Sequence, residues 1–128
     1  MVTEYARIAL YWTYALSEAI FNVTTFNQFS KNDDVIFHGD AVFVLSSVIP
    51  DHSVDLIFAD PPYNIGKQFS KFHDKWDSDE DYAEWCYQWL TLCINKLKPN
   101  GSLYVMTSTQ AMPYIDLFLR KRIHVLSR

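Results

Sequence analysis

An apolar run that leads directly into a rigid polar turn constrains the fold of this chain more than any other feature. Residues 54–59 are apolar apart from one aspartate, and the four residues that follow are Asp60, Pro61, Pro62 and Tyr63. A run of this length predicts a strand that is buried on both faces. Such strands occur in parallel sheets covered by helices, so the run favours an α/β fold.

The segments around this strand alternate in the order that a parallel sheet requires. A helix is predicted to begin after Ser78, because Ser78 and Asp81 have capping-box spacing and apolar residues then recur every three or four positions. Residues 99–101, Pro-Asn-Gly, are expected to stop it. The other expected elements are strands at residues 35–38, 102–107 and 123–126 and helices at residues 41–48 and 110–119. Strand, helix, strand in this order predicts a mostly parallel sheet flanked by helices.

The first 34 residues differ from the rest and contain no motif that we can name. A helix is expected over residues 4–20, followed by a polar linker over residues 27–34. We therefore expect two units, an N-terminal segment of unknown role at residues 1–34 and a catalytic unit at residues 35–128.

Composition excludes several classes of function. The apolar run over residues 8–16 is too short to cross a membrane, which takes about 20 residues, so a cytoplasmic protein without a membrane partner is expected. Cys86 and Cys93 are seven positions apart on the predicted helix, too far for a disulfide, and we expect reduced core thiols. The chain has no cysteine–histidine cluster at ligand spacing, so no metal is expected. Its net charge of −4 argues against strong DNA binding by this chain alone.

Ligands of open α/β sheets bind beyond the carboxyl ends of the strands. The residues expected there are Asp40, the four residues from Asp60 to Tyr63, and residues 107–110. The Asp-Pro-Pro-Tyr motif continues as Asn64, Ile65, Gly66 and Lys67. As a bare tetrapeptide it would be an ordinary strand-ending turn, since Asp and Pro are common turn residues. Its place directly after a buried strand favours a functional site.

This segment resembles the catalytic motif of site-specific DNA adenine-N6 methyltransferases, in the class whose catalytic motif precedes the cofactor-binding motif. The resemblance extends over about residues 36–122 and includes the segments 36–41, 54–67, 98–104 and 112–117. It implies a partial, truncated Rossmann-like methyltransferase fold that uses S-adenosylmethionine. It also implies DNA as the partner, with the target adenine flipped out of the duplex.

The resemblance gives each motif residue a role. An exocyclic amine is a poor nucleophile because its lone pair is conjugated with the ring. Asp60 through its carboxylate and Pro61 through its carbonyl would accept the two N–H groups and favour a pyramidal nitrogen. Pro62 completes the catalytic motif, and the Tyr63 ring would stack on the target base.

Further roles are predicted for residues outside the tetrapeptide. Asp40 and Asp60 are predicted to contact the cofactor, although Asp40 has an equally good role as the N-cap of the helix at residue 41. Asn64, Lys67 and Ser108 are predicted, with Tyr63, to contact substrate. A solvated turn is the alternative for Asn64 and Lys67.

The glycine-rich cofactor loop of this class is missing from the sequence, whose three glycines are Gly39, Gly66 and Gly101. In this class that loop and the target-recognition region follow the catalytic half. We therefore expect a truncated chain with little or no methyltransferase activity of its own, and pairing with a separately encoded, complementary C-terminal half is an alternative. Cytosine-N4 methylation of DNA, N6 methylation of RNA and a non-enzymatic binding role remain alternatives.

Overall fold

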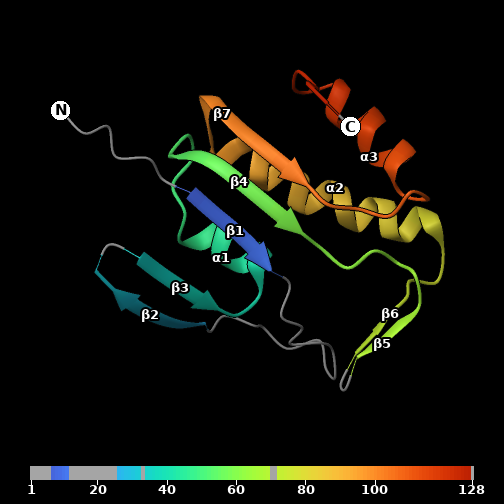
Figure 1. Ribbon diagram of the computed structural model, residues 1–128, viewed down its shortest axis with the longest axis horizontal. Helices are drawn as coiled ribbons and strands as arrows, with labels where there is room; N and C mark the ends of the chain where they lie inside the picture. The colour runs from blue at the N-terminus through green and yellow to red at the C-terminus, as the bar shows by residue number, and fades with distance from the viewer. Residues whose placement is uncertain (1–6, 12–25, 33, 70–71, 128) are drawn as a thin grey trace.

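A three-stranded parallel sheet forms the centre of the protein. The computed structural model describes residues 7–11, 26–32, 34–69 and 72–127. The sheet has the order β1–β4–β7, and its strands are β1 Arg7–Tyr11, β4 Val54–Asp60 and β7 Leu97–Val105. Figure 1 shows α1 (Ala41–Ser47) and α2 (Asp79–Lys96) behind these strands, while α3 (Met112–Arg120) follows β7. The predicted α/β class with a parallel sheet and flanking helices is confirmed.

The predicted N-terminal helix is wrong where the structure describes it. Arg7–Tyr11 is a strand that pairs with β4 in parallel, with Ile8 beside Ile57 and Tyr11 beside Asp60. The rest of the predicted helix lies outside the described residues. The backbone hydrogen bonds of this strand come from pairing with β4, which the local sequence pattern does not predict. Tertiary pairing therefore outweighs the local preference of this apolar segment for a helix.

The predicted polar linker and the strand after it form a separate hairpin. β2 (Asn27–Lys31) and β3 (Asp34–His38) pair in antiparallel fashion, with Asn27 beside His38. The strand predicted at residues 35–38 therefore exists but belongs to this two-stranded sheet, and β1 takes the place in the parallel sheet that we assigned to it. The hairpin also crosses the unit boundary that we drew at residue 34.

The hydrophobic core lies between the sheet and α2. β4 contributes Val54, Ile57 and Ala59, and its pairing with β7 is irregular between Val54 and Leu56. The apolar face of α2 meets them, as the helical spacing predicts. Its buried residues are Tyr82, Ala83, Cys86, Trp89, Leu90 and Cys93.

The ends of α2 show how local sequence sets its length. The Ser78 hydroxyl accepts a hydrogen bond from the Asp81 amide at 3.0 Å and donates one to the Asp81 carboxylate at 2.7 Å, which confirms the predicted cap. The helix ends at Lys96, and β7 begins at once with Leu97 and continues through the Pro-Asn-Gly sequence. A Cβ at Gly101 would lie 2.9 Å from the Leu97 side chain and 3.0 Å from the carbonyl oxygens of Lys98 and Val54, so a larger residue here would force these neighbours to shift.

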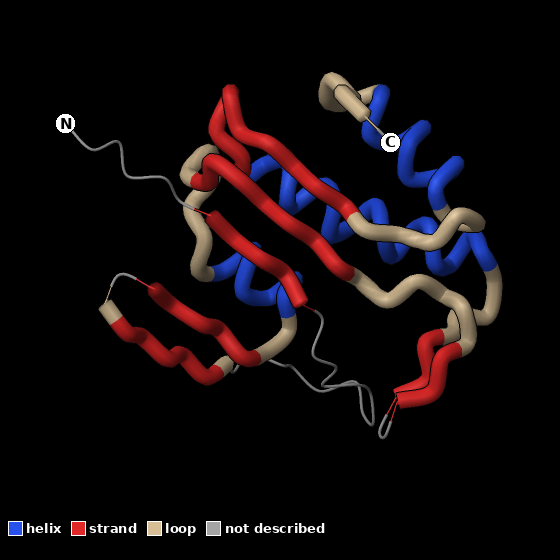
Figure 2. Tube along the Cα trace, viewed as in Figure 1, coloured by secondary structure: helices blue, strands red, loops and turns tan. Residues whose placement is uncertain are grey.

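Two further differences concern the ends of the predicted pattern. Residues 123–126, predicted as a strand, form no strand. A small hairpin that was not predicted, β5 (Lys67–Phe69) and β6 (Phe72–Asp74), follows the carboxyl end of β4, where Figure 2 shows it extending away from the sheet. Within the described residues, no helix is both long and apolar enough to cross a membrane.

The two cysteine thiols are predicted to react slowly in the native protein. Both are buried and unpaired, and burial raises the pKa of Cys86 to about 11 and that of Cys93 to about 12. Since the thiolate is the reactive form, labelling by Ellman's reagent at pH 8 should be more than about 100-fold slower in buffer than in denaturant. Rapid stoichiometric labelling of the folded chain would contradict this burial.

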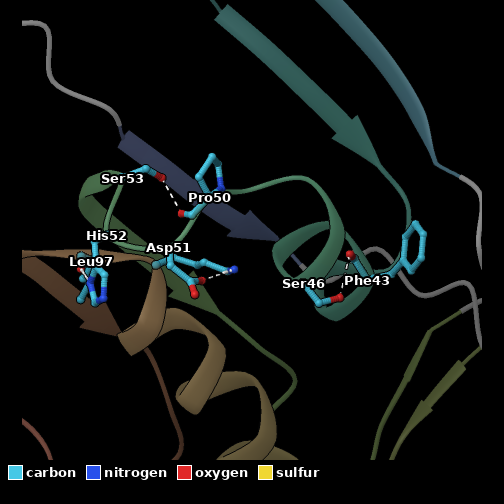
Figure 3. A network of polar contacts seen from close by, with 8 residues as sticks. Phe43, Ser46, Pro50, Asp51, His52, Ser53 and Leu97 are labelled. Atoms are coloured by element: carbon cyan, nitrogen blue, oxygen red, sulfur yellow. Dashed lines mark hydrogen bonds and ion pairs between the residues drawn. The ribbon is translucent and has the colours of Figure 1, made fainter.

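A buried lysine on α2 pairs with a carboxylate in the turn between α1 and β4. Lys96 is 6% exposed, and its ammonium donates to the Asp51 carboxylate at 2.5 Å. Figure 3 shows Asp51 in this turn, next to His52, whose ring nitrogen lies 3.1 Å from the Leu97 carbonyl oxygen. The hydrogen bond from Lys96 and the lysine's charge together lower the pKa of Asp51 below its usual 3.8.

This ion pair predicts a pH dependence of stability. A carboxyl whose pKa is lowered by folding stabilises the protein above its unfolded pKa, and that contribution disappears as the pH falls through the folded pKa. Wild type should therefore be more stable than Asp51→Asn at about pH 6, and the difference should shrink as the pH falls below 3.8 and through the lowered pKa of Asp51. Chemical unfolding of both proteins across this range measures it. A difference that stays constant with pH would show that the charge on Asp51 is not the cause.

Candidate catalytic loop

The Asp-Pro-Pro-Tyr motif lies at the carboxyl end of the central strand. β4 ends at Asp60, and the Met106 amide donates to the Ala59 carbonyl at 2.8 Å, which keeps the chain beyond β7 beside this point. Asp60 is half-buried and Pro61 is buried. The candidate catalytic loop, which comprises residues 60–66 and is called the catalytic loop below, therefore starts at the sheet edge where ligands of α/β folds bind.

Tyr63 is tied to Asp60 within the motif. Its hydroxyl donates to one Asp60 carboxylate oxygen, Oδ1, at 2.5 Å. Desolvation, and secondarily the hydrogen bond to Asp60 and its charge, raise the pKa of Tyr63 to about 12. The tyrosine is therefore neutral at physiological pH and keeps donating this hydrogen bond. An ionised carboxylate has about four lone-pair positions on two oxygens, so the bond leaves Asp60 with capacity for another donor.

The main chain of the motif is fixed from α2. The Tyr82 hydroxyl donates to the Pro62 carbonyl oxygen at 2.6 Å, and burial raises the pKa of this tyrosine far above its usual value. Tyr82 itself packs edge-on against the Trp76 ring at a centroid distance of 4.9 Å. The Pro61 carbonyl, in contrast to that of Pro62, accepts no hydrogen bond from the described residues.

Asp74 contacts the loop more extensively than any residue that the sequence pointed to. Its carboxylate accepts hydrogen bonds from the amides of Tyr63 at 3.2 Å, Asn64 at 2.8 Å and Ile65 at 3.5 Å. Sequence reasoning missed this residue, because only the unpredicted β5–β6 hairpin brings it back to the loop.

The Asn64 side chain, predicted to contact substrate, bonds within the protein at both ends. Its oxygen accepts from the Trp76 amide at 2.9 Å, and its nitrogen donates to the Asp79 carboxylate at 3.3 Å. The residue has a left-handed backbone, with φ of +58°. These contacts connect the loop to the start of α2, and a direct contact of Asn64 with substrate stays a prediction.

Three predicted residues remain, and one of them, Lys67, lies beside Asp74 as its strand partner in the β5–β6 hairpin. Asp40 is exposed and caps α1 by accepting a hydrogen bond from the Phe43 amide at 2.7 Å. This is the N-cap role, one of the two roles predicted for it. Ser108 follows β7 and accepts from the Ala111 amide at 3.2 Å. Lys67 is exposed at the start of β5. The predicted roles of these three residues in binding cofactor or substrate stay predictions.

Among the described residues, no group of three or more histidine, cysteine, aspartate or glutamate side chains is arranged to hold a metal ion.

Comparison with known proteins gives a consistent result. A family described as DNA methylase matches residues 54–127, more than half of the chain. The chain is 46% identical over 101 residues to the DNA adenine methyltransferase YhdJ of Escherichia coli K12. The aligned region covers 79% of this chain and 34% of that protein. It is 34% identical over 89 residues to the type II methyltransferase M.BamHI of Bacillus amyloliquefaciens, covering 70% of this chain and 21% of the relative. A third relative, the type II methyltransferase M.HinfI of Haemophilus influenzae, is 39% identical over 90 residues. This alignment covers 60% of this chain and 25% of the relative. The chain thus spans about a third or less of the length of these relatives.

Proposed function

This chain belongs to the DNA methylase family, and from that premise we propose that it provides the catalytic loop for methyl transfer to the exocyclic N6 amine of adenine in DNA. The observation that carries the proposal is the Asp-Pro-Pro-Tyr loop at the end of β4, with a carboxylate, a carbonyl and an aromatic ring in four consecutive residues. Adenine is favoured over cytosine because the relative with 46% identity is named as an adenine methyltransferase.

Asp60 and Pro61 act on the target amine. The Asp60 carboxylate accepts one N–H of the amine, and the Pro61 carbonyl, which accepts no hydrogen bond among the described residues, accepts the other. These two acceptors favour a pyramidal nitrogen and hold its lone pair towards the methyl donor. Acceptors that are fixed before the reaction stabilise the positive charge that develops on nitrogen without reorganising.

Two further hydrogen bonds hold the Tyr63 ring and the main chain at Pro62 in place. The hydrogen bond from Tyr63 to Asp60 fixes the tyrosine ring next to the carboxylate, where it can stack on a base that has left the duplex. The bond between Tyr82 and the Pro62 carbonyl keeps the main chain in place. Tyr63 is a donor only while it is neutral, and because its pKa is raised to about 12 it stays neutral well above physiological pH.

The proposed methyl donor is S-adenosylmethionine, whose sulfonium supplies an already activated methyl group when it is bound. The residues present fit the positive charge of this donor, because the carboxylate of Asp60 lies at the end of β4 and that of Asp40 follows β3. We propose Asp60 and Asp40 as donor contacts. Lys67 and Ser108 are proposed to contact the nucleic acid, and Lys67 is exposed, as a phosphate contact requires.

A chimera tests the proposed function, because the chain spans only part of its relatives. In this chimera, the region of the E. coli relative that matches the chain is replaced by the corresponding residues of this chain. We expect the purified chimera to transfer tritiated methyl groups from S-adenosylmethionine to duplex DNA. A folded chimera that binds the methyl donor and DNA but transfers no label would overturn the proposal.

A further inference from the structure

Asp74 is a buried carboxylate that the catalytic mechanism does not use. It is 3% exposed, and the only other charged residue buried among the described residues, Lys96, has an ion-pair partner. Asp74 takes part in no ion pair within the described part of the chain. Burying a carboxylate is costly unless hydrogen bonds replace its water, so the groups around Asp74 must supply them.

Those groups are three consecutive backbone amides of the catalytic loop. The amides of Tyr63, Asn64 and Ile65 all donate to the Asp74 carboxylate, at distances between 2.8 and 3.5 Å. A left-handed residue within a short turn lets successive amides converge on one anion, and Asn64 has φ of +58°. The loop thus forms a small anion-binding concavity, and the anion that fills it comes from the same chain.

The β5–β6 hairpin delivers that anion. It starts directly after the loop, pairs Lys67 with Asp74, and closes with the Gly66 amide donating to the Asp74 carbonyl at 2.7 Å. Gly66 has φ of +73°, which a residue with a side chain would adopt only under strain. The hairpin therefore holds the side chain of Asp74 against residues 63–65 and its main chain against residue 66.

We propose that Asp74 is a positioning residue, which fixes the catalytic loop so that Asp60, Pro61 and Tyr63 keep the geometry that methyl transfer requires. It acts through Tyr63, whose amide it binds and whose hydroxyl binds Asp60. The importance of this position for catalysis rests on the proposed function. The anchoring of the loop by Asp74 does not, and it can be measured separately.

Amide hydrogen exchange of the 128-residue chain, followed by NMR, tests the anchoring. In wild type, the amides of residues 63–65 should exchange at least about 10-fold more slowly than exposed loop amides such as those of Thr109 and Gln110. In Asp74→Asn, one carboxylate oxygen becomes an NH₂ donor facing amide donors, and exchange at residues 63–65 should accelerate about 10- to 100-fold. Asp77→Asn is the matched control, because Asp77 is exposed and lies three residues away, and exchange should be unchanged.

Two outcomes would overturn the proposal. One is fast exchange of residues 63–65 in the wild-type chain, which can be read even if Asp74→Asn fails to fold. The other is a folded Asp74→Asn variant in which these amides exchange as in wild type.

The kinetic arm uses the chimera. There, Asp74→Asn should lower kcat about 10- to 100-fold, with KM for S-adenosylmethionine changed little, because a misplaced loop slows the reaction more than it weakens binding. An unchanged kcat would overturn the positioning role. If the wild-type chimera transfers no methyl groups, the proposed function fails, and the exchange measurement still decides whether Asp74 anchors the loop.

Discussion

Replacing Asp60 by asparagine should lower kcat for methyl transfer by about 100- to 1000-fold, the range found when a preorganised polar group is removed from a reacting centre. The carboxamide keeps one oxygen but loses the negative charge that stabilises a positively charged nitrogen. The Tyr63 hydroxyl, which donates to Asp60 at 2.5 Å, would compete for that single remaining oxygen. The measurement is single-turnover transfer of labelled methyl groups by the chimera at saturating donor and DNA.

Glu84→Gln is the matched control for this experiment. It makes the same carboxylate-to-carboxamide change at an exposed position of α2, outside the catalytic loop. Its rate should equal that of wild type within about twofold, since isolated surface changes have small effects. If Asp60→Asn folded normally and transferred methyl groups at the rate of Glu84→Gln, the assigned role of Asp60 would be wrong.

Replacing Trp89 by alanine should destabilise the folded chain by about 3–5 kcal/mol, the cost of truncating a buried tryptophan or phenylalanine. Trp89 is fully buried in the face of α2 that packs on the sheet, and its ring lies 6.1 Å from the Trp85 ring centroid. The truncation leaves a cavity in the core between α2 and the sheet, because the neighbouring side chains relax only in part. Urea unfolding followed by circular dichroism measures the change in the free energy of unfolding.

Leu117→Ala is the control for this second prediction. Leu117 is 58% exposed on α3, so its truncation should change the free energy of unfolding by about 0.5 kcal/mol or less. Equal losses in the two variants would mean that α2 does not form the core. If Trp89→Ala leaves too little folded protein to measure, Trp89→Phe, which retains part of the ring volume, should still cost more than Leu117→Ala.

The elements that could be predicted are those whose signals are local. β4 follows from a run that is apolar apart from one aspartate, α1 has Asp40 as its N-cap, and α2 has both its cap at Ser78 and its apolar face in the sequence. The catalytic loop could be placed because in parallel sheets the functional residues follow the strands. In each of these cases local propensity and tertiary packing favour the same structure.

The elements that could not be predicted depend on partners far away in the sequence. β1 is a strand because it pairs with β4, some 49 residues further on, and β2 is a strand because it pairs with β3. A polar segment such as Asn27–Lys31, whose five residues are all exposed, carries no burial pattern that would reveal a strand. The strand expected at residues 123–126 shows the opposite error, since an apolar run there has no strand partner among the described residues.

The same reasoning explains which part of the site was missed. Asp60 and Tyr63 are adjacent to the strand end, so their closeness follows from the sequence. Asp74 lies eleven residues after Tyr63, and its contact with the loop requires the turn of the β5–β6 hairpin and the left-handed conformations of Asn64 and Gly66. Asn and Gly near a short polar segment indicate a turn, but they do not indicate which side chain the turn brings back.

The central claim is that this loop directs a methyl group to the exocyclic amine of adenine, and the most direct test is to identify the methylated nucleoside. DNA treated with the chimera and S-adenosylmethionine would be digested to nucleosides and analysed by mass spectrometry. We predict N6-methyladenine in wild type, reduced about 100-fold or more in Asp60→Asn. Methylation found at cytosine N4, or N6-methyladenine formed equally well by Asp60→Asn, would contradict the account.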